Sequence, residues 1–189
     1  MDYPLNALGL SHQFIASHVK EGALCIDGTA GRGRDTLFLC NLVGPSGKVH
    51  AFDIQEEAVT STTELLKQHA ITWADVHLEN HCHIDQYFTP DSVDAIMFNF
   101  GWLPGGNHHV FSHGETSVEA IEKGLALLKP GGVMSLCIYY GRESGYEERD
   151  TLLTYLQTTD QKRFSVLLGN FINRTNEPPM VVFIFKDRI

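Results

Sequence analysis

Apolar residues along the chain fall into short blocks of two kinds, and the two kinds alternate over most of its length. Blocks of the first kind are nearly continuous apolar runs, such as 92–100 and 180–187, which are typical of strands that are covered on both faces. Blocks of the second kind, such as 56–70, carry apolar residues at helical spacing with polar residues between them. The pattern therefore predicts strands that alternate with helices, as in an α/β domain.

The blocks also give the order of the predicted elements. Strands are predicted at 23–30, 48–54, 74–80, 92–100, 132–140, 164–172 and 180–187, and helices at 35–43, 56–70, 115–128 and 146–159. Strands joined through a helix pair in parallel, whereas the last two strands follow each other directly and are expected to pair antiparallel. The sequence thus predicts one Rossmann-like α/β domain over residues 1–189, with a seven-stranded, mainly parallel sheet, a C-terminal antiparallel hairpin and helices on both faces.

Composition narrows the class of protein further. The 189 residues are 43% hydrophobic and 20% charged, and the formal net charge of −9 excludes a broadly basic protein that binds nucleic acid without specificity. No apolar run approaches the roughly 20 residues that span a bilayer, and the first residues lack the basic start and apolar core of a secretion signal. The four cysteines are widely spaced without a CxxC pair. We therefore expect reduced thiols, a cytoplasmic location and no membrane partner.

The first predicted strand runs into a glycine-rich turn at the edge of the sheet where such domains bind ligands. Gly31 and Gly33 allow the backbone to turn tightly and to approach a ligand closely. A dinucleotide site would carry a third glycine at position 36, where this chain has Thr36, and the GK[ST] sequence of a phosphate-binding loop is missing as well. The turn therefore favours a nucleoside ligand that is not held by phosphates.

An acidic residue, Asp53, ends the second predicted strand twenty residues after Gly33. A carboxylate at this place can accept hydrogen bonds from both hydroxyls of a ribose, while Ile54 is expected against the adenine face and Gln55 as the cap of the next helix. With Asp27 near the cofactor's amino group, the arrangement predicts S-adenosylmethionine as the cofactor. The alternative is an ordinary tight turn with a solvent-exposed Asp53, but the loop, the spacing and the acid would then coincide by chance.

A polar segment follows the third predicted strand. Asn80 or Asp85 is expected to hold the adenine amino group, a place that an acidic or amide residue takes in many methyltransferases of this fold. His81, Cys82 and His83 supply three donors of the kind that zinc prefers. No matching second pair of ligands occurs elsewhere in the chain, so no metal site is predicted.

The fourth predicted strand ends at Asn99, where an unsatisfied amide would be costly. Its side-chain oxygen can accept a hydrogen bond from a substrate N–H, and a backbone carbonyl near Gly101 can reach the same nitrogen. Two acceptors on one amine would turn its lone pair toward a methyl donor, so Asn99 is the predicted catalytic residue, and Trp102 is expected to stack on a base. The alternative is a structural asparagine that caps a turn beside a buried tryptophan.

Three segments of the chain resemble the MnmM (YtqB-type) family of bacterial methyltransferases, which were formerly labelled as rRNA methylases. The segments are DGTAGRGRDTLFL from Asp27, AFDIQ from Ala51 and NFGWLPGG from Asn99. The likeness continues through Tyr140 and into Asn176-Glu177-Pro178-Pro179, and so covers almost the whole chain. It implies that the single domain has the Rossmann-like fold of class I methyltransferases.

The resemblance further implies methyl transfer from S-adenosylmethionine to the aminomethyl nitrogen of 5-aminomethyl-(2-thio)uridine at the tRNA wobble position, with the tRNA anticodon region as partner. Pattern and resemblance together place these residues on the cofactor side: Asp27, Thr29, Ala30, Gly31, Arg32, Gly33, Asp35, Thr36, Asp53, Ile54, Gln55, Asn80 and His81. They place these on the substrate side: Asn99, Gly101, Trp102, Pro104, Gly105, Tyr140, Arg142 and Arg174.

Four arginines depart from the family pattern. Arg32 stands where the family usually has Asn, Arg34 and Arg142 where His is common, and Arg174 where Gln is common. All four belong to loops at the predicted carboxyl ends of strands, and we call them the arginine rim. The rim would give an acidic protein a local positive surface beside its cleft, whereas the alternative is four separately solvated arginines.

Other functions stay open at this point. A methyltransferase that acts on rRNA, a small molecule or a protein amine agrees with the acidic net charge. A nicotinamide oxidoreductase is disfavoured by the missing third glycine. A non-catalytic binding module is disfavoured by the intact Asp53 and Asn99. A homodimer is considered as well, although no motif in the chain specifies one.

Overall fold

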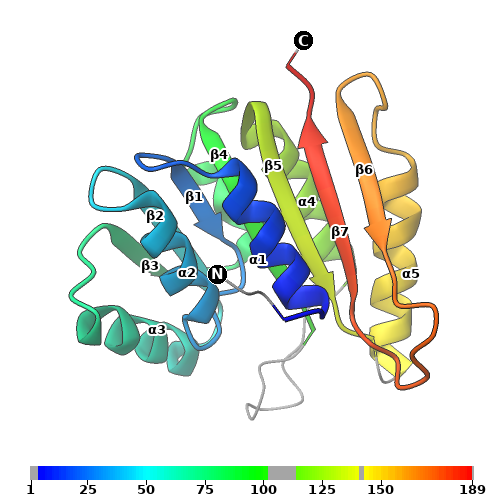
Figure 1. Cartoon of the computed structure of the whole chain (residues 1–189), viewed down its shortest axis with the longest axis horizontal. Coiled ribbons are helices and arrows are strands. Elements are labelled where there is room, and N and C mark those ends of the chain that lie inside the picture. The colour runs from blue at the N-terminus through cyan, green and yellow to red at the C-terminus, as the bar shows by residue number, and fades with distance from the viewer. Residues whose placement is uncertain (1–3, 102–113, 141–142, 189) are drawn as a thin grey trace.

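The computed structural model describes residues 4–101, 114–140 and 143–188. Within this part of the chain, seven strands form one sheet in the order β3-β2-β1-β4-β5-β7-β6 (Figure 1). The strands are β1 (Leu24–Asp27), β2 (Lys48–Asp53), β3 (Ala74–Leu78), β4 (Val93–Phe100), β5 (Leu128–Ile138), β6 (Phe164–Gly169) and β7 (Met180–Lys186). The first five are parallel, and β7 is antiparallel to both β5 and β6. The predicted sheet and its C-terminal hairpin are therefore confirmed.

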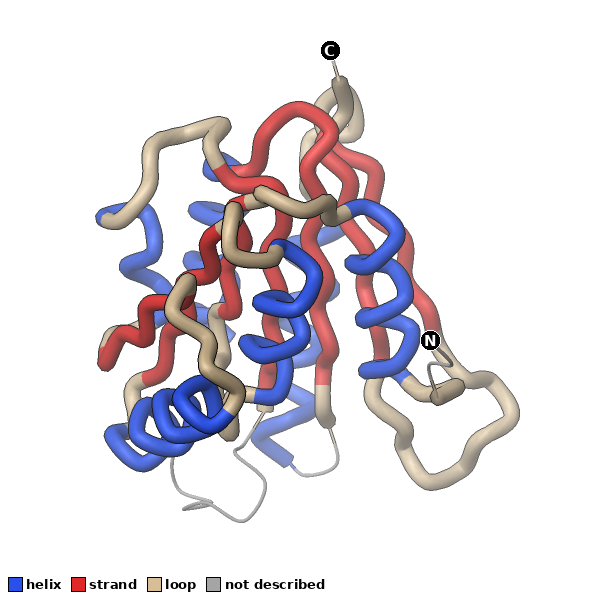
Figure 2. Tube along the Cα trace, turned by 60° about the vertical axis from the view of Figure 1, so that its left-hand side comes forward, coloured by secondary structure: helices blue, strands red, loops and turns tan. Residues whose placement is uncertain are grey.

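Helices cover both faces of the sheet, as the sequence predicts (Figure 2). The helices are α1 (Ala7–His18), α2 (Arg34–Val43), α3 (Glu56–Gln68), α4 (Gly114–Leu127) and α5 (Glu143–Gln157), with a short 3₁₀ helix, η1 (His81–Gln86). None of the helices in the described residues has both the length and the apolar character needed to cross a membrane.

Buried hydrophobic residues on both faces of the sheet hold the layers together. The core beneath η1, α4 and α5 includes Phe52, Ile84, Phe98, Phe100, Ile121 and Leu152. The core beneath α1, α2 and α3 includes Ile15, Leu39, Val43, Leu66 and Met97. Strand β4 contributes to both cores with alternate residues, because successive side chains of a strand point to opposite faces. This explains the nearly continuous apolar run in its sequence.

Helix α1 and the short helix η1 are elements that the hydrophobic pattern does not predict. The buried face of α1 consists of Ala7, Gly9, Ser11 and Ile15, of which only Ile15 is a large apolar residue. Ser11 contributes through a hydrogen bond of its hydroxyl to that of Ser135 on β5, at 2.8 Å. A better signal for this helix is Asn6, whose side chain accepts a hydrogen bond from the Gly9 backbone N–H at 2.7 Å and caps the helix.

Strand β5 begins at Leu128, four residues earlier than predicted. The polar sequence Lys129-Pro130-Gly131-Gly132 suggests a turn, and within β5 it forms a bulge. Val93 pairs with Leu128 and Ala95 with Val133, so these four residues stand outside the pairing, and Gly131 has a φ of 81°. The Lys129 ammonium contacts the Asp94 carboxylate at 2.8 Å, and Asp94 also accepts a hydrogen bond from the Leu24 backbone N–H. The register between β4 and β5 shifts at the same place, between Val93 and Ala95. Pro130 is tolerated because it lies in this bulge, where the ladder needs no backbone N–H from it.

Candidate active site

The loop between β1 and α2 lies across the carboxyl ends of the central strands. The Gly28 backbone N–H donates to the Met97 carbonyl of β4 and the Ala30 N–H to the Phe52 carbonyl of β2, both at 2.9 Å. A Cβ atom at Gly28 would lie 2.1 Å from the Phe98 ring. The loop can therefore pack this closely against the strand ends only because residue 28 is a glycine.

Two further glycines shape the turn into α2. Gly31 and Gly33 have backbone φ angles of 54° and 76°, in the left-handed region that glycine adopts without strain. A Cβ atom at Gly33 would also meet the Thr62 backbone on α3 at 2.9 Å. Gly33 occupies the N-cap position of α2 without any side-chain cap, so backbone N–H groups at the start of this helix face the loop.

Asp53, at the end of β2, holds the loop from the other side. One carboxylate oxygen accepts a hydrogen bond from the Gly31 N–H at 2.9 Å, and the other accepts from the Gln55 N–H at 3.0 Å. Partial burial raises the pKa of this carboxyl above its ordinary value. Each carboxylate oxygen has more than one acceptor site, so Asp53 retains the capacity to bind a pair of hydroxyl groups.

The residues that follow Asp53 differ in how they match their predicted places. Ile54 is 52% exposed and presents an apolar surface beside the carboxylate. Gln55 takes the N-cap position of α3, as predicted, but its side chain makes no capping hydrogen bond. The position is therefore correct, and the capping contact is wrong.

Asp27 lies beneath the loop, fully buried at 0% exposure. Its carboxylate accepts hydrogen bonds from the Thr36 hydroxyl at 2.6 Å and from the Thr29 N–H at 3.1 Å. Burial, and then the nearby carboxylates of Asp35 and Asp53, raise the pKa of Asp27 to about 7, although the hydrogen bonds from Thr36 and Thr29 oppose the shift. Asp27 is thus a structural support of the loop as well as a titratable group close to neutral pH.

Asn99 joins a side-chain network that also includes Asp35 and His12. The Asn99 amide nitrogen donates to Asp35 Oδ2 at 2.6 Å, and His12 Nε2 lies 2.7 Å from Asp35 Oδ1. The Asn99 backbone N–H donates to the Thr29 hydroxyl at 2.7 Å. The other amide atom, Asn99 Oδ1, is buried without a hydrogen-bond partner among the described residues. His12 comes from α1 and is absent from the predicted site.

The β3 side of the site is formed by Asn80 and His81. The Asn80 side chain accepts a hydrogen bond from the Cys82 N–H at 3.0 Å and caps η1. The His81 ring packs edge-on against the rings of Phe98 and Phe100, with 5.9 Å between ring centroids in each pair. Burial lowers the pKa of His81 to about 4, which keeps the ring neutral although a hydrogen bond with the Gly28 backbone opposes the shift. His81 Nε2 is buried and has no partner in the described structure.

The other residues considered near His81 are engaged elsewhere. His83 pairs with Glu79 at 2.8 Å, and Asp85 lies 3.2 Å from the Lys123 ammonium. In the described part of the chain, no three His, Cys, Asp or Glu side chains are grouped so that they could hold a metal ion.

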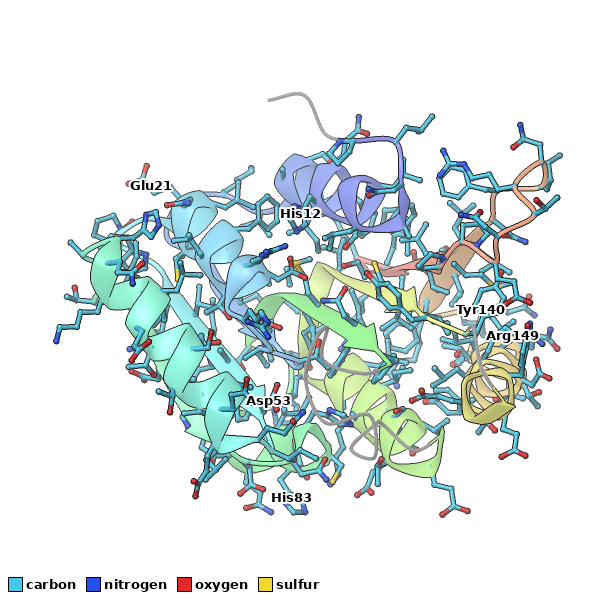
Figure 3. The ribbon with its side chains drawn as sticks, turned by 90° about the horizontal axis from the view of Figure 1, so that it is seen from below. His12, Glu21, Asp53, His83, Tyr140 and Arg149 are labelled. Carbon is cyan, nitrogen blue, oxygen red and sulfur yellow. The ribbon has the colours of Figure 1, made fainter. Side chains whose placement is uncertain are left out.

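The substrate side is only partly described. Trp102, Pro104, Gly105 and Arg142 lie outside the described residues. Gly101 has a φ of 142° and directly follows β4 at this edge. Tyr140, which is 8% exposed, follows β5, and the guanidinium of Arg149 on α5 lies 5.0 Å from the centre of its ring. Figure 3 looks onto this edge from below, with Asp53 on one side of it and Tyr140 and Arg149 on the other.

Three arginines of the rim are described, and all three are exposed. Arg32 and Arg34 stand at the start of α2, whereas Arg174 belongs to the loop between β6 and β7. The Arg174 guanidinium lies 3.8 Å from the centre of the Phe171 ring and donates to the Leu5 carbonyl at 2.9 Å. The three described arginines of the rim are therefore divided between two loops of the same edge, and Arg174 is tied to neighbouring residues.

Comparison with known families and curated proteins adds to this geometry. The family described as "Putative rRNA methylase" matches residues 49–185. A relative from Arabidopsis thaliana, named tRNA (mnm(5)s(2)U34)-methyltransferase, chloroplastic, is 32% identical over an alignment 191 residues long, which covers 95% of this chain and 69% of the relative.

Solved structures match along nearly the whole chain. One, described as a putative rRNA-methylase from Clostridium thermocellum, shares 41% identity with a TM-score of 0.94 and covers 97% of this chain and 98% of its own. Another, a putative methyltransferase from Streptococcus mutans in complex with SAH, shares 36% identity with a TM-score of 0.88 and covers 97% of this chain and 99% of its own.

Proposed function

Because the chain belongs to the family described as putative rRNA methylases, we propose that it is an S-adenosylmethionine-dependent methyltransferase that acts on tRNA. The reaction that we propose methylates the aminomethyl nitrogen of 5-aminomethyl-(2-thio)uridine at the wobble position. The name of the Arabidopsis relative, which is similar over 95% of this chain, supports this substrate. The family match over residues 49–185 also confirms the family resemblance noted from the sequence motifs.

The residues at the strand ends fit the cofactor. Asp53 offers carboxylate oxygens for the ribose hydroxyls, and Ile54 beside it is 52% exposed and apolar, as an adenine face requires. His81 Nε2 is a buried acceptor without a partner among the described residues, and such an atom is costly unless a ligand satisfies it. The Streptococcus mutans structure contains SAH, which is what remains of S-adenosylmethionine after its methyl group has been transferred.

We further propose that the loop between β1 and α2 binds the cofactor, with Asp27 near the cofactor's amino group. The glycines at 28, 31 and 33 allow close approach of the backbone, and the uncapped start of α2 offers N–H donors. Asp27 places a carboxylate of raised pKa below the loop, where a positively charged amino group would favour its ionised form. The contacts of Thr29, Ala30, Arg32, Thr36, Gln55 and Asn80 with the cofactor stay predictions.

Asn99 Oδ1 is the single observation that carries the proposed chemistry. The atom is a buried hydrogen-bond acceptor without a partner in the described structure, on a side chain whose amide nitrogen is fixed by Asp35. An amine N–H can satisfy this acceptor, as a hydroxyl O–H also can, whereas an oxygen without a proton cannot. The site therefore agrees with a nucleophile that carries a proton, such as the proposed amine.

In the mechanism that we propose, the protein orients the amine and excludes water. S-adenosylmethionine supplies an activated methyl group, and as the amine nitrogen bonds to its carbon, the carbon–sulfur bond breaks and sulfur keeps the electron pair. Asn99 Oδ1 accepts one amine N–H and turns the lone pair toward that methyl group. An alkylamine is mostly protonated near neutral pH, and poorly hydrated surroundings favour its neutral form. Holding two reactants in line can lower a barrier by about 7–11 kcal/mol.

The test of this function uses purified protein and S-adenosylmethionine with a labelled methyl group. Transfer is measured to tRNA from cells that make the aminomethyl precursor, to tRNA from cells that lack it, and to rRNA. We expect label only in the first tRNA. Label in rRNA, or equal label in both tRNA samples, would favour a different substrate. The anticodon region as the contact surface, a homodimer and a cytoplasmic location stay predictions.

A further inference from the structure

We propose that Asp35, supported by His12, is a positioning residue for methyl transfer: it fixes the Asn99 amide so that Oδ1, and not the NH₂ group, faces the substrate nitrogen. The sequence suggested a contact between Asp35 and the cofactor, and this role replaces that suggestion. The inference rests on the proposed function, because it assigns the device that orients the amine acceptor.

The orientation follows from what a carboxylate can do. A carboxylate accepts hydrogen bonds and donates none. Asn99 therefore has to present its NH₂ group to Asp35, as the distance of 2.6 Å between Asn99 Nδ2 and Asp35 Oδ2 indicates. The amide is planar with its oxygen and nitrogen on opposite sides, so Oδ1 points away from Asp35. Without this contact, rotation of the amide by half a turn would offer the substrate a donor in place of an acceptor.

Asp35 is itself held in place. It is 6% exposed, and its second oxygen lies 2.7 Å from His12 Nε2. The His12 ring stacks on Phe38 with 3.9 Å between ring centroids and an interplanar angle of 6°, which limits its rotation. Both oxygens of Asp35 thus have short contacts with side chains of the protein, from α1 on one side and from β4 on the other.

Asn99 is held as firmly at its backbone. Its N–H donates to the Thr29 hydroxyl at 2.7 Å, and the residue pairs with Cys137 in the ladder between β4 and β5. Only the side-chain torsions are left to be set, and Asp35 sets them. A network that served stability alone would be expected to satisfy all of its polar atoms. This one leaves Asn99 Oδ1 without a partner among the described residues.

Two substitutions at Asp35 separate positioning from the other roles of a carboxylate. Asp35→Leu removes both acceptors and keeps a branched side chain with the same number of heavy atoms, whereas Asp35→Asn keeps one oxygen that can accept from Asn99. We expect Asp35→Leu to lower kcat about 100-fold, the order of loss that a misplaced reacting group causes, with cofactor affinity by calorimetry within about twofold of wild type. Asp35→Asn is expected to restore kcat to within about tenfold of wild type. The same two changes at Asp75, an exposed partner of Lys48, are the matched controls.

Three results would overturn the proposal. One is an unchanged kcat in Asp35→Leu. Another is a loss of cofactor affinity in both variants, which would return Asp35 to the cofactor. The third is an equal loss of kcat in both variants, which would mean that the charge of Asp35 is needed and not its acceptor geometry.

A second pair of variants and a spectroscopic signal cover the case in which Asp35→Leu does not fold. His12→Phe keeps a ring that can stack on Phe38 but removes the contact with Asp35, whereas His12→Gln keeps a donor. We expect kcat to fall about tenfold in His12→Phe and to recover in His12→Gln, and equal kcat in both variants would contradict the proposal. The side-chain NH₂ signals of Asn99 in NMR spectra should shift in His12→Phe but not in Asp75→Asn. The NMR signal does not depend on the substrate, so the two proposals can fail separately. If wild-type protein labels no tRNA, the proposed function is wrong. If the Asn99 signals do not shift in His12→Phe, the positioning role is wrong.

Discussion

Asp53 and Asn99, at the ends of two different strands, hold the same loop at positions two residues apart. The Asp53 carboxylate accepts the Gly31 N–H at 2.9 Å, and the Thr29 hydroxyl accepts the Asn99 N–H at 2.7 Å. The predicted ribose contact and the predicted amine acceptor therefore belong to one site at one edge of the sheet. This relationship allows the cofactor and substrate roles to be tested separately.

Replacing Asn99 by Ala should separate catalysis from cofactor binding. We expect turnover to fall about 100-fold, because the amine loses the acceptor that orients it, while cofactor affinity stays within about twofold of wild type. Steady-state methyl transfer and calorimetry measure the two quantities. Asn41→Ala, on the exposed face of α2, is the control. Unchanged turnover in Asn99→Ala would refute the assigned role.

Replacing Asp53 by Ala should have the opposite pattern. Hydrogen bonds to a charged group contribute about 1.5–3 kcal/mol, so the dissociation constant of the cofactor should rise about tenfold to 100-fold. The dissociation constant for Asp53→Asn, which keeps one acceptor oxygen, should lie between the values for wild type and Asp53→Ala. Equal cofactor affinity in wild type and Asp53→Ala, measured by calorimetry, would count against the ribose contact.

Replacing Gly28 by Ala should destabilise the loop through a clash with Phe98. The added Cβ would lie 2.1 Å from the ring, and overpacking of this kind costs about 1–3 kcal/mol. Chemical denaturation should therefore show a lower free energy of unfolding for Gly28→Ala. The loss of free energy of unfolding that Gly28→Ala causes should be smaller in protein that also carries Phe98→Leu, because the clashing ring is then absent. Equal losses in both backgrounds would show that the ring is not the cause.

The raised pKa of Asp27 predicts a pH-dependent stability difference. The pKa rises from 3.8 to about 7 on folding because the carboxyl is buried near other carboxylates. The folded protein therefore binds more protons than the unfolded chain between these values, and this stabilisation is fully present below pH 3.8 and is lost as pH rises to about 7. Asp27→Asn lacks the titration, so its free energy of unfolding relative to wild type should increase over this range and then level off. A difference that does not change with pH would contradict the raised pKa.

The fold was largely accessible from the sequence because most elements have buried apolar runs or helical periodicity. Helix α1 was not, since three of its four buried residues are Ala7, Gly9 and Ser11, whose small or polar side chains leave no periodic apolar signal. Because helix α1 was not predicted, His12 was missing from the predicted site as well. Its contact with Asp35 joins residues 23 positions apart, and no local pattern indicates such a contact.

The candidate site was accessible to a different degree in each part. The glycine loop and Asp53 follow a known spacing, and the structure brings them together. The roles of Asn80 and Asp35 could not be judged from spacing, because their hydrogen bonds to the Cys82 N–H and to Asn99 depend on the folded geometry. Arg149 was missed for the same reason: it reaches Tyr140 from the middle of α5.

Mass spectrometry of nucleosides after a reaction in vitro tests the proposed methylation itself. Purified protein and S-adenosylmethionine are incubated with a tRNA that carries 5-aminomethyl-2-thiouridine at the wobble position, beside a parallel reaction with Asn99→Ala. We predict that the wild-type protein converts this nucleoside to its form with one methyl group on the aminomethyl nitrogen, and that the variant does so about 100-fold more slowly. An unmodified nucleoside with wild-type protein, or a methyl group on any other atom, would contradict the account.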